Sequence, residues 1–228
     1  MKWNMKLDRW DRWNYGSDRF GGSWDDYDRP TISLKKKRRI GTSDTEIKHL
    51  LIAWVAISFA FAILLRGYGN ILELFLVSLI TVGVSFLLHE LAHKIVAQHY
   101  GLWAEFRMDP TMLVLAIVSA FIGFLFAAPG AVQIFGYYIS KKQNGHISLA
   151  GPLTNIVLAL IFLSLSFNSG FLGLIGTFGF YINILLAAFN LLPFWVLDGK
   201  KVWDWNPTVY AIVAIPIFGL AFVVFFGL

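Results

Sequence analysis

The chain has 228 residues and a net charge of +5; 57% of its residues are hydrophobic and only 14% are charged. Soluble domains are about 45–50% apolar and about 25% charged, so this composition argues against a soluble domain and predicts an integral membrane protein. The chain contains no cysteine, which excludes disulfide bonds and thiolate metal sites and leaves His, Asp and Glu as ligands for any metal.

The beginning of the chain differs in composition from the rest. The first 49 residues hold 12 of the 19 Lys and Arg residues and 8 of the 14 acidic residues, and their aromatic residues follow no helical or strand period. Such a sequence is typical of disorder, so we expect residues 1–46 to form a cytoplasmic, disordered basic and aromatic tail. The basic run KKKRR at 35–39 indicates the cytoplasmic side and contact with the anionic lipid of the bilayer, and we expect no nucleic-acid partner.

Six apolar segments follow the tail. A helix that spans a membrane needs about 20 residues, and most of these segments approach that length. We therefore expect residues 47–228 to form an all-α, polytopic helical bundle of about five to six membrane segments, with its functional core at 71–203. The segments lie at 50–65, 71–98, 111–128, 147–167, 171–192 and 208–227.

The second apolar segment ends in LLHELAHKIVAQ, which places His89, Glu90 and His93 at membrane depth. Ionisable side chains cost roughly 2.5–3.5 kcal/mol each there, which favours a function over three polar groups that merely pair with neighbouring helices. Residues four apart lie on one face of a helix, so His89 and His93 can bind one metal ion. Glu90 can reach a water on that ion, and H-E-x-x-H is a pattern of zinc proteases.

A catalytic zinc ion usually takes three protein ligands, so one more ligand must come from elsewhere. Asp198 is favoured, because Pro193 interrupts the preceding helix and Gly199 permits an irregular backbone that lines a cavity. Without His89 and His93, Asp198 would be better interpreted as a turn residue at a helix end. The remaining candidates lie at segment ends or face away: His49, Glu73, His99 and His146.

Three motifs occur together in this chain: HELAH at 89–93, AGPLTN at 150–155 and NLLPFWVLDG at 190–199. In this order they resemble the site-2 protease family of intramembrane zinc metalloproteases. The resemblance covers about residues 71–203 and implies Zn²⁺ as the cofactor.

The resemblance also implies roles for single residues. His89, His93 and Asp198 would bind zinc, Glu90 would be the catalytic glutamate, and Asn190 would help to hold the reacting carbonyl. The family usually has a second proline at the position of Trp195 and often a further glycine at the position of Lys200. These two departures affect the expected shape of the substrate groove and not the expected ligands.

The depth of the candidate ligands determines the expected topology. With the basic run inside, the first apolar segment runs outward and the second returns, so His89 lies near the cytoplasmic end of its helix. Asp198 follows the out-and-back pair 147–167 and 171–192 and must reach the same depth. The chain between the second segment and residue 147 must therefore leave and return on one side of the membrane.

A re-entrant helix–strand hairpin would satisfy this requirement. About 16 helical residues would descend from residue 111, the sequence APG at 128–130 would turn, and residues 131–139 would return as an extended strand. The stretch AVQIFGYYIS at 131–140 favours a strand because it is rich in β-branched and aromatic residues. Two short spans are the alternative.

The expected strand also offers a way to hold a substrate. One edge would pair within the protein, near residues 104–108, and the other would pair with an unwound substrate by strand addition. The expected substrate-binding positions are Ala131, Gln133 and Phe135, with Asn155 as a second candidate donor to the reacting carbonyl. Alternatively, both edges pair internally and Asn155 is a structural contact between helices.

These features predict a zinc metalloendopeptidase that cleaves a protein substrate within or next to its transmembrane segment. Zinc lowers the pKa of its bound water toward about 7, and Glu90 would act as the general base. The alternatives are a membrane metal-binding or transport protein and an inactive relative that binds helices. Glu90 favours the protease, because transport needs no base.

Overall fold

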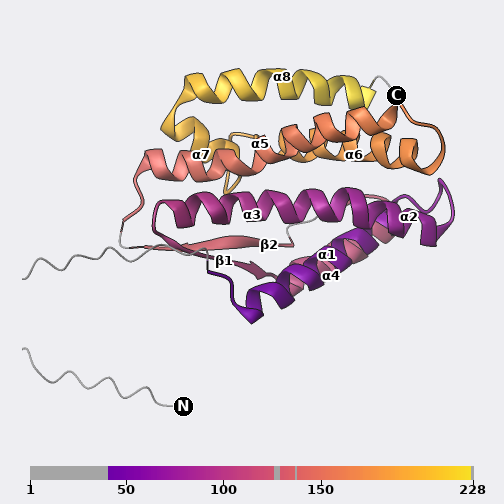
Figure 1. The fold of residues 1–228 in the computed structure, drawn as a ribbon, viewed down its shortest axis with the longest axis horizontal. Coiled ribbons are helices and arrows are strands. Elements are labelled where there is room, and N and C mark those ends of the chain that lie inside the picture. The colour runs from indigo at the N-terminus through magenta and orange to yellow at the C-terminus, as the bar shows by residue number, and fades with distance from the viewer. Residues whose placement is uncertain (1–40, 126–128, 137, 227–228) are drawn as a thin grey trace, which may run out of the picture. The chain divides into compact units, whose positions relative to one another are not determined.

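The computed structural model describes residues 41–125, 129–136 and 138–226 (Figure 1). Most of the predicted tail, including the basic run at 35–39, lies outside the described residues, as does Ala128 of the predicted turn.

Among the described residues, five helices are long and apolar enough to cross a membrane. One of them, Ile71–His99, consists of α2 (Ile71–Ser78), a π-helical turn η2 (Leu79–Gly83) and α3 (Val84–His99). This arrangement confirms the predicted helical membrane protein. The other four are α1 (Asp44–Leu64), α5 (Lys141–Ser166), α6 (Gly170–Asn190) and α8 (Pro207–Phe226).

Two of these helices begin several residues before their apolar segments because polar side chains cap them. Ser43 caps α1 by accepting the N–H of Glu46, so the end of the predicted tail is helical. Ser140 and Gln143 form a reciprocal capping box at the start of α5. The first turn of each helix is therefore polar, and the apolar span continues the same helix.

The π-helical turn packs the helix of the HELAH motif against α1. The indole N–H of Trp54 donates to the carbonyl of Leu79 at 3.0 Å. Gly83 lies against the same indole ring, and a Cβ added there would be 2.0 Å from it. Glycine is therefore required for this close contact, which holds α1 against the helix six residues before His89.

The region between α3 and α5 forms the predicted helix–strand hairpin. Its helix α4 (Pro110–Ile122) has 13 residues and is about 20 Å long, too short to cross a bilayer core of about 30 Å. Gly123 ends α4 in the left-handed conformation, with φ 92°. The C-terminal end of α4 lies beside the turn between α1 and α2, where the Arg66 guanidinium donates to the carbonyls of Ala120 and Phe121.

The turn of this hairpin lies earlier than predicted. The carbonyl of Pro129 accepts the N–H of Asp109 at 3.0 Å, so the chain has returned to the start of α4 by residue 129. The expected turn at 128–130 is wrong, because Gly123 supplies the left-handed residue that ends the helix. The chain has therefore returned before Pro129 and does not use the strand for the return.

A two-stranded antiparallel sheet follows from this return. Strand β1 (Trp103–Met108) pairs with β2 (Gly130–Phe135), as predicted for residues near 104–108, and Phe106 lies opposite Val132. The N–H of Phe106 donates to Glu46 and the N–H of Val132 donates to Glu90, so this pair is not hydrogen-bonded across the sheet.

The pairing determines which backbone groups face the outer edge of β2. Hydrogen-bonded and non-hydrogen-bonded pairs alternate in an antiparallel ladder, so the N–H and C=O groups of Val132 and Ile134 face outward. Those of Ala131, Gln133 and Phe135 face β1, although their side chains are exposed. The N–H groups of Gln133 and Phe135, two of the predicted substrate-binding positions, therefore face β1, because alternating exposure describes the two faces of a strand and not its two edges.

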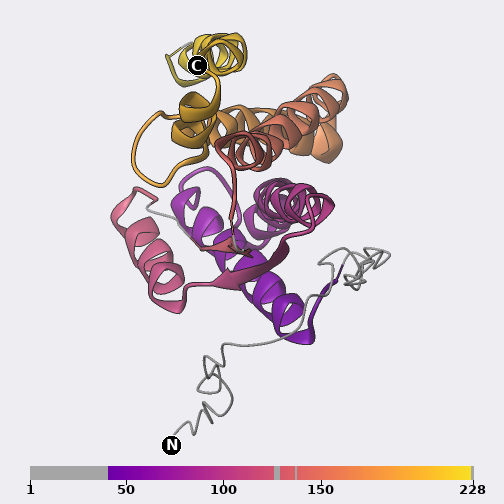
Figure 2. The same cartoon turned by 90° about the vertical axis from the view of Figure 1, so that its left-hand side faces the viewer.

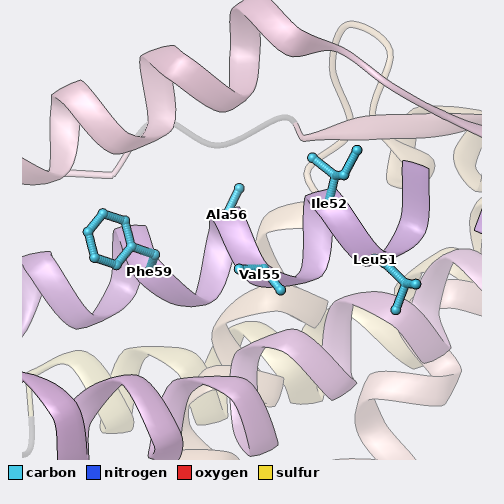
Figure 3. A pocket seen from close by; sticks show the side chains of 5 residues that line it. All are labelled: Leu51, Ile52, Val55, Ala56 and Phe59. Carbon is cyan, nitrogen blue, oxygen red and sulfur yellow. The ribbon is translucent and has the colours of Figure 1, made fainter. Parts of the chain in front are cut away.

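Helix α3 lies between two groups of elements. One buried cluster joins α5, α6, α7 (Asp198–Trp205) and α8, and another joins α1, α3, α4 and β1 (Figures 1 and 2). An apolar groove of about 490 Å³ lies along α1 (Figure 3). Its lining contains no candidate catalytic residue: Leu51, Ile52, Val55, Ala56 and Phe59.

Candidate metal centre

Two turns of α3 and the first residue of α7 bring three candidate ligands together. The Nε2 atoms of His89 and His93 are 3.0 Å apart. The Asp198 Oδ2 lies 3.4 Å from His89 Nε2 and 3.1 Å from His93 Nε2. All three residues are buried, and their ligand atoms lie within 4.8 Å of one another.

The hydrogen bonds of the two imidazoles determine which ring nitrogen is free. His93 Nδ1 lies 2.7 Å from the carbonyl of Ile147, which can only accept, so Nδ1 carries the proton. His89 Nδ1 lies 2.6 Å from Asn155 Oδ1. Since the Asn155 amide nitrogen donates to the Ser85 carbonyl, its Oδ1 faces His89. Both Nε2 lone pairs therefore point toward Asp198.

This donor set fits a zinc ion. Two imidazole lone pairs and a carboxylate, close together and buried, repel one another without a cation between them. Two nitrogens and one carboxylate oxygen match the three protein ligands of a catalytic zinc site.

Two glycines leave the space that the centre needs. A Cβ on Gly151 of α5 would lie 2.5 Å from the Nε2 atoms of both histidines. A Cβ on Gly199 would lie 2.0 Å from the carbonyl oxygen of Leu191 at the end of α6. Gly151 lets α5 close over the histidines, and Gly199 lets α7 approach α6 closely enough to insert Asp198.

Glu90 lies between the three ligands and the sheet. Its Oε2 accepts the N–H of Val132 at 3.1 Å, on the outer edge of β2. Glu90 also interacts electrostatically with His93, His89 and Asp198. It is therefore placed beside the centre without belonging to the group of three ligands.

Asn155 is completely buried in a network that reaches His89. Its Oδ1 bonds to His89 Nδ1, and its amide nitrogen donates to Asn183 Oδ1 at 3.0 Å and to the Ser85 carbonyl. Asn183 in turn donates to the Ser85 hydroxyl at 2.7 Å. The Asn155 amide is thus fully used between helices and supports a ligand.

The sequence reasoning missed Asn183 and Ser85. A signal for both existed, because Asn183 interrupts the apolar run of α6 and Ser85 precedes His89 by about one helical turn. Polar residues inside apolar spans pair with one another or mark functional sites.

The structure also describes the surroundings of other residues that the sequence singled out. Asn190 ends α6, and its amide donates to the carbonyl of Leu186 at 2.9 Å. Trp195 is 80% exposed and has a left-handed backbone, with φ 54°, in the loop before Asp198. His146 bonds to the Tyr100 hydroxyl, and the described residues contain no metal group that includes His146.

Comparison with known proteins identifies three relatives. A protein of Methanocaldococcus jannaschii named "Putative zinc metalloprotease" is 46% identical over 182 residues, which are 78% of this chain and 93% of that protein. A Bacillus subtilis protein, also named "Putative zinc metalloprotease", is 30% identical over 146 residues, or 54% of this chain and 65% of that protein. A second M. jannaschii protein, named "Zinc metalloprotease", is 30% identical over 123 residues, or 52% of this chain and 31% of that protein.

No family model and no solved structure matches the chain. The match to the first relative nevertheless covers nearly the whole length of that protein. The names of all three relatives contain the words zinc metalloprotease. The chain therefore belongs to the zinc metalloprotease family of these relatives, which is a site-2 protease-like family.

Proposed function

We propose that this protein is an intramembrane zinc metalloendopeptidase that hydrolyses a peptide bond within or next to the transmembrane helix of a protein substrate. The observation that carries the proposal is the convergence of His89, His93 and Asp198 inside a bundle of apolar helices, with Glu90 beside them. His89, His93 and Asp198 would hold the zinc ion.

The chain's own residues then have separate tasks. Bound zinc would supply a Lewis acid for the scissile carbonyl and acidify a water molecule. The Glu90 carboxylate would take a proton from the attacking water and deliver it to the leaving amide nitrogen. Asn190 would donate to the reacting carbonyl oxygen through the second N–H of its amide, since the bond to the carbonyl of Leu186 uses one of the two.

The sheet supports a docking edge for an unwound substrate. The outer edge of β1 is occupied, because Glu46 accepts the Phe106 N–H and Gln98 donates to the Ala104 carbonyl. The outer edge of β2 presents the N–H and C=O of Ile134 and carries Glu90 at Val132. A substrate strand added to β2 would therefore run past the proposed base, with its backbone extended for hydrolysis.

We propose that the centre lies near the cytoplasmic side and that the N-terminus is cytoplasmic. Lys141 and Lys142 at the start of α5 and Lys200 and Lys201 in α7 are at the end of the bundle that holds the metal centre. Positive residues collect on the cytoplasmic side of membrane proteins.

The first prediction tests the role of Glu90. Glu90→Gln removes the base but keeps the shape of the side chain, so the purified protein should still bind about one zinc ion per chain and should lose most cleavage of a transmembrane substrate. A good general base contributes roughly 10²–10⁴-fold to the rate. Zinc content and cleavage are measured side by side for wild type and variant.

Three outcomes would contradict the proposal in different ways. Loss of zinc from the Glu90→Gln protein would make Glu90 a ligand. Wild-type cleavage by the variant would remove its role as base. Zinc binding by a wild type that cleaves no transmembrane substrate would favour the metal-binding, transport or helix-binding alternative.

A further inference from the structure

A buried ion pair lies next to the candidate metal centre on the same helix. Lys94 follows His93 and is 1% exposed, and Glu46 of α1 is 0% exposed. The Lys94 ammonium donates to the Glu46 carboxylate and, at 2.8 Å, to the Thr42 hydroxyl. Apolar residues of similar volume often stabilise a protein as well as a buried ion pair does, so this pair calls for an explanation besides stability.

Glu46 has a second partner in the sheet. Its Oε1 accepts the N–H of Phe106 in β1 at 3.0 Å. Phe106 lies opposite Val132, whose N–H donates to Glu90 at 3.1 Å. The sheet is therefore held at both outer edges by a carboxylate, Glu46 on the β1 edge and Glu90 on the β2 edge.

These contacts form a closed circuit through α3. Glu90 and Lys94 are four residues apart and lie on one face of the helix. From Glu90 the circuit passes through Val132 and Phe106 to Glu46, and the ion pair returns it to Lys94. A shift of β1 along this path would move Val132 relative to Glu90.

We propose that Glu46 is a positioning residue for the hydrolytic reaction. Its carboxylate, oriented by Lys94, holds the sheet where the outer edge of β2 meets Glu90. This inference rests on the proposed function. We expect the loss of Glu46 to lower the rate of the chemical step and to leave metal binding unchanged. The described partners of its carboxylate are Lys94 and Phe106, and neither is a candidate ligand.

Two double variants separate positioning from stability. Glu46→Gln with Lys94→Met and Glu46→Leu with Lys94→Met both remove the buried charges and keep similar volumes. Only the glutamine variant keeps an oxygen that accepts the Phe106 N–H. We expect the leucine variant to have a kcat about ten- to a hundredfold below that of the glutamine variant, with equal KM and zinc content in the two.

A second readout does not depend on activity. Backbone hydrogen exchange of residues 130–135, followed by mass spectrometry, should be faster in the leucine variant than in the glutamine variant, with or without zinc. If the leucine variant fails to fold in detergent, Glu46→Asp replaces it. The shorter Asp side chain keeps the charge beside Lys94 but cannot also reach Phe106, so the same loss in kcat is expected.

The outcomes distinguish this inference from the proposed function. Equal kcat and equal exchange in both double variants would overturn the positioning role, and so would equal losses in both. If wild type cleaves no substrate, the proposed function fails, and the exchange comparison still decides whether Glu46 holds the sheet.

Discussion

At the scale of single residues, the candidate metal centre depends on which nitrogen of each imidazole carries the proton. The carbonyl of Ile147 and the Asn155 Oδ1 each accept a hydrogen bond from an Nδ1–H group. Both Nε2 lone pairs therefore face Asp198. Partners of this kind orient metal ligands and typically change metal affinity by about 10–100-fold when removed. The sequence motif predicts which histidines could bind the metal, whereas residues of α5 orient their rings.

Gly151 provides a direct test of the space around the two imidazoles. Gly151→Ala places a Cβ 2.5 Å from both Nε2 atoms, so the imidazoles or α5 must move, and zinc affinity should fall by at least about tenfold. Zinc titration of the purified protein measures the change. Gly219→Ala is the matched control, because a Cβ there meets nothing within 4 Å; equal affinity in both variants would show that α5 does not confine the centre.

Asp198 can be tested in the same way. Asp198→Asn removes the anionic ligand, so zinc affinity should fall by at least about tenfold while the helical content in detergent stays the same. Asp204→Asn is the control, since Asp204 lies on the same helix and its described ion pair is with the exposed Lys200. Wild-type zinc affinity in the Asp198→Asn protein would mean that the third ligand lies elsewhere.

At the scale of elements, the sheet shows which edge can receive another strand. Glu46 and Gln98 occupy the outer edge of β1, so we propose the outer edge of β2 as the docking edge for a substrate strand. The sequence alternation of β2 correctly separates exposed from half-buried side chains. It does not reveal which residues direct their backbone groups outward, because that depends on the pairing with β1.

Proline substitutions test this docking edge. Ile134→Pro removes an outward N–H without removing a bond to β1, so the protein should fold and keep zinc. One hydrogen bond is worth about 0.5–1.5 kcal/mol net, so kcat/KM should fall by roughly three- to tenfold. Ile134→Val, which keeps the N–H, is the control. Gln133→Pro removes a bond to β1 and should destabilise the sheet itself.

Kinetics on the transmembrane substrate check this prediction. If Ile134→Pro and Ile134→Val cleave at the same rate, β2 is not the docking edge. In that case the sheet would serve only to hold Glu90.

At the scale of the whole molecule, several contacts bring the ends of distant segments together. Lys94 meets the start of α1, Tyr100 meets His146 of α5, and the His146 and Trp205 rings are 4.4 Å apart. The starts of α1 and α5 and the ends of α3 and α7 therefore lie at one end of the bundle. Arg66 lies at the opposite end, beside the C-terminus of α4.

Single cysteines in this cysteine-free chain test the membrane orientation. Cysteines replacing Tyr68, Gln143 and Lys201 should be labelled by a membrane-impermeant reagent from the outside, the inside and the inside, respectively. The unmodified chain is the control and should not be labelled. Labelling of the cysteine at Gln143 from the outside would show that the segment between α3 and α5 crosses the membrane.

The sequence alone determined the class of the protein, the long apolar helices and the three candidate ligands that the structure brings together. Composition and the spacing of His89 and His93 are local properties, and a helix of given length and period keeps them in any packing. The outward edge of β2, the network of Asn155 with Asn183 and the circuit through Glu46 were decided by the tertiary structure. Each of these depends on contacts between residues far apart in the chain, and such contacts leave no periodic signal in the sequence.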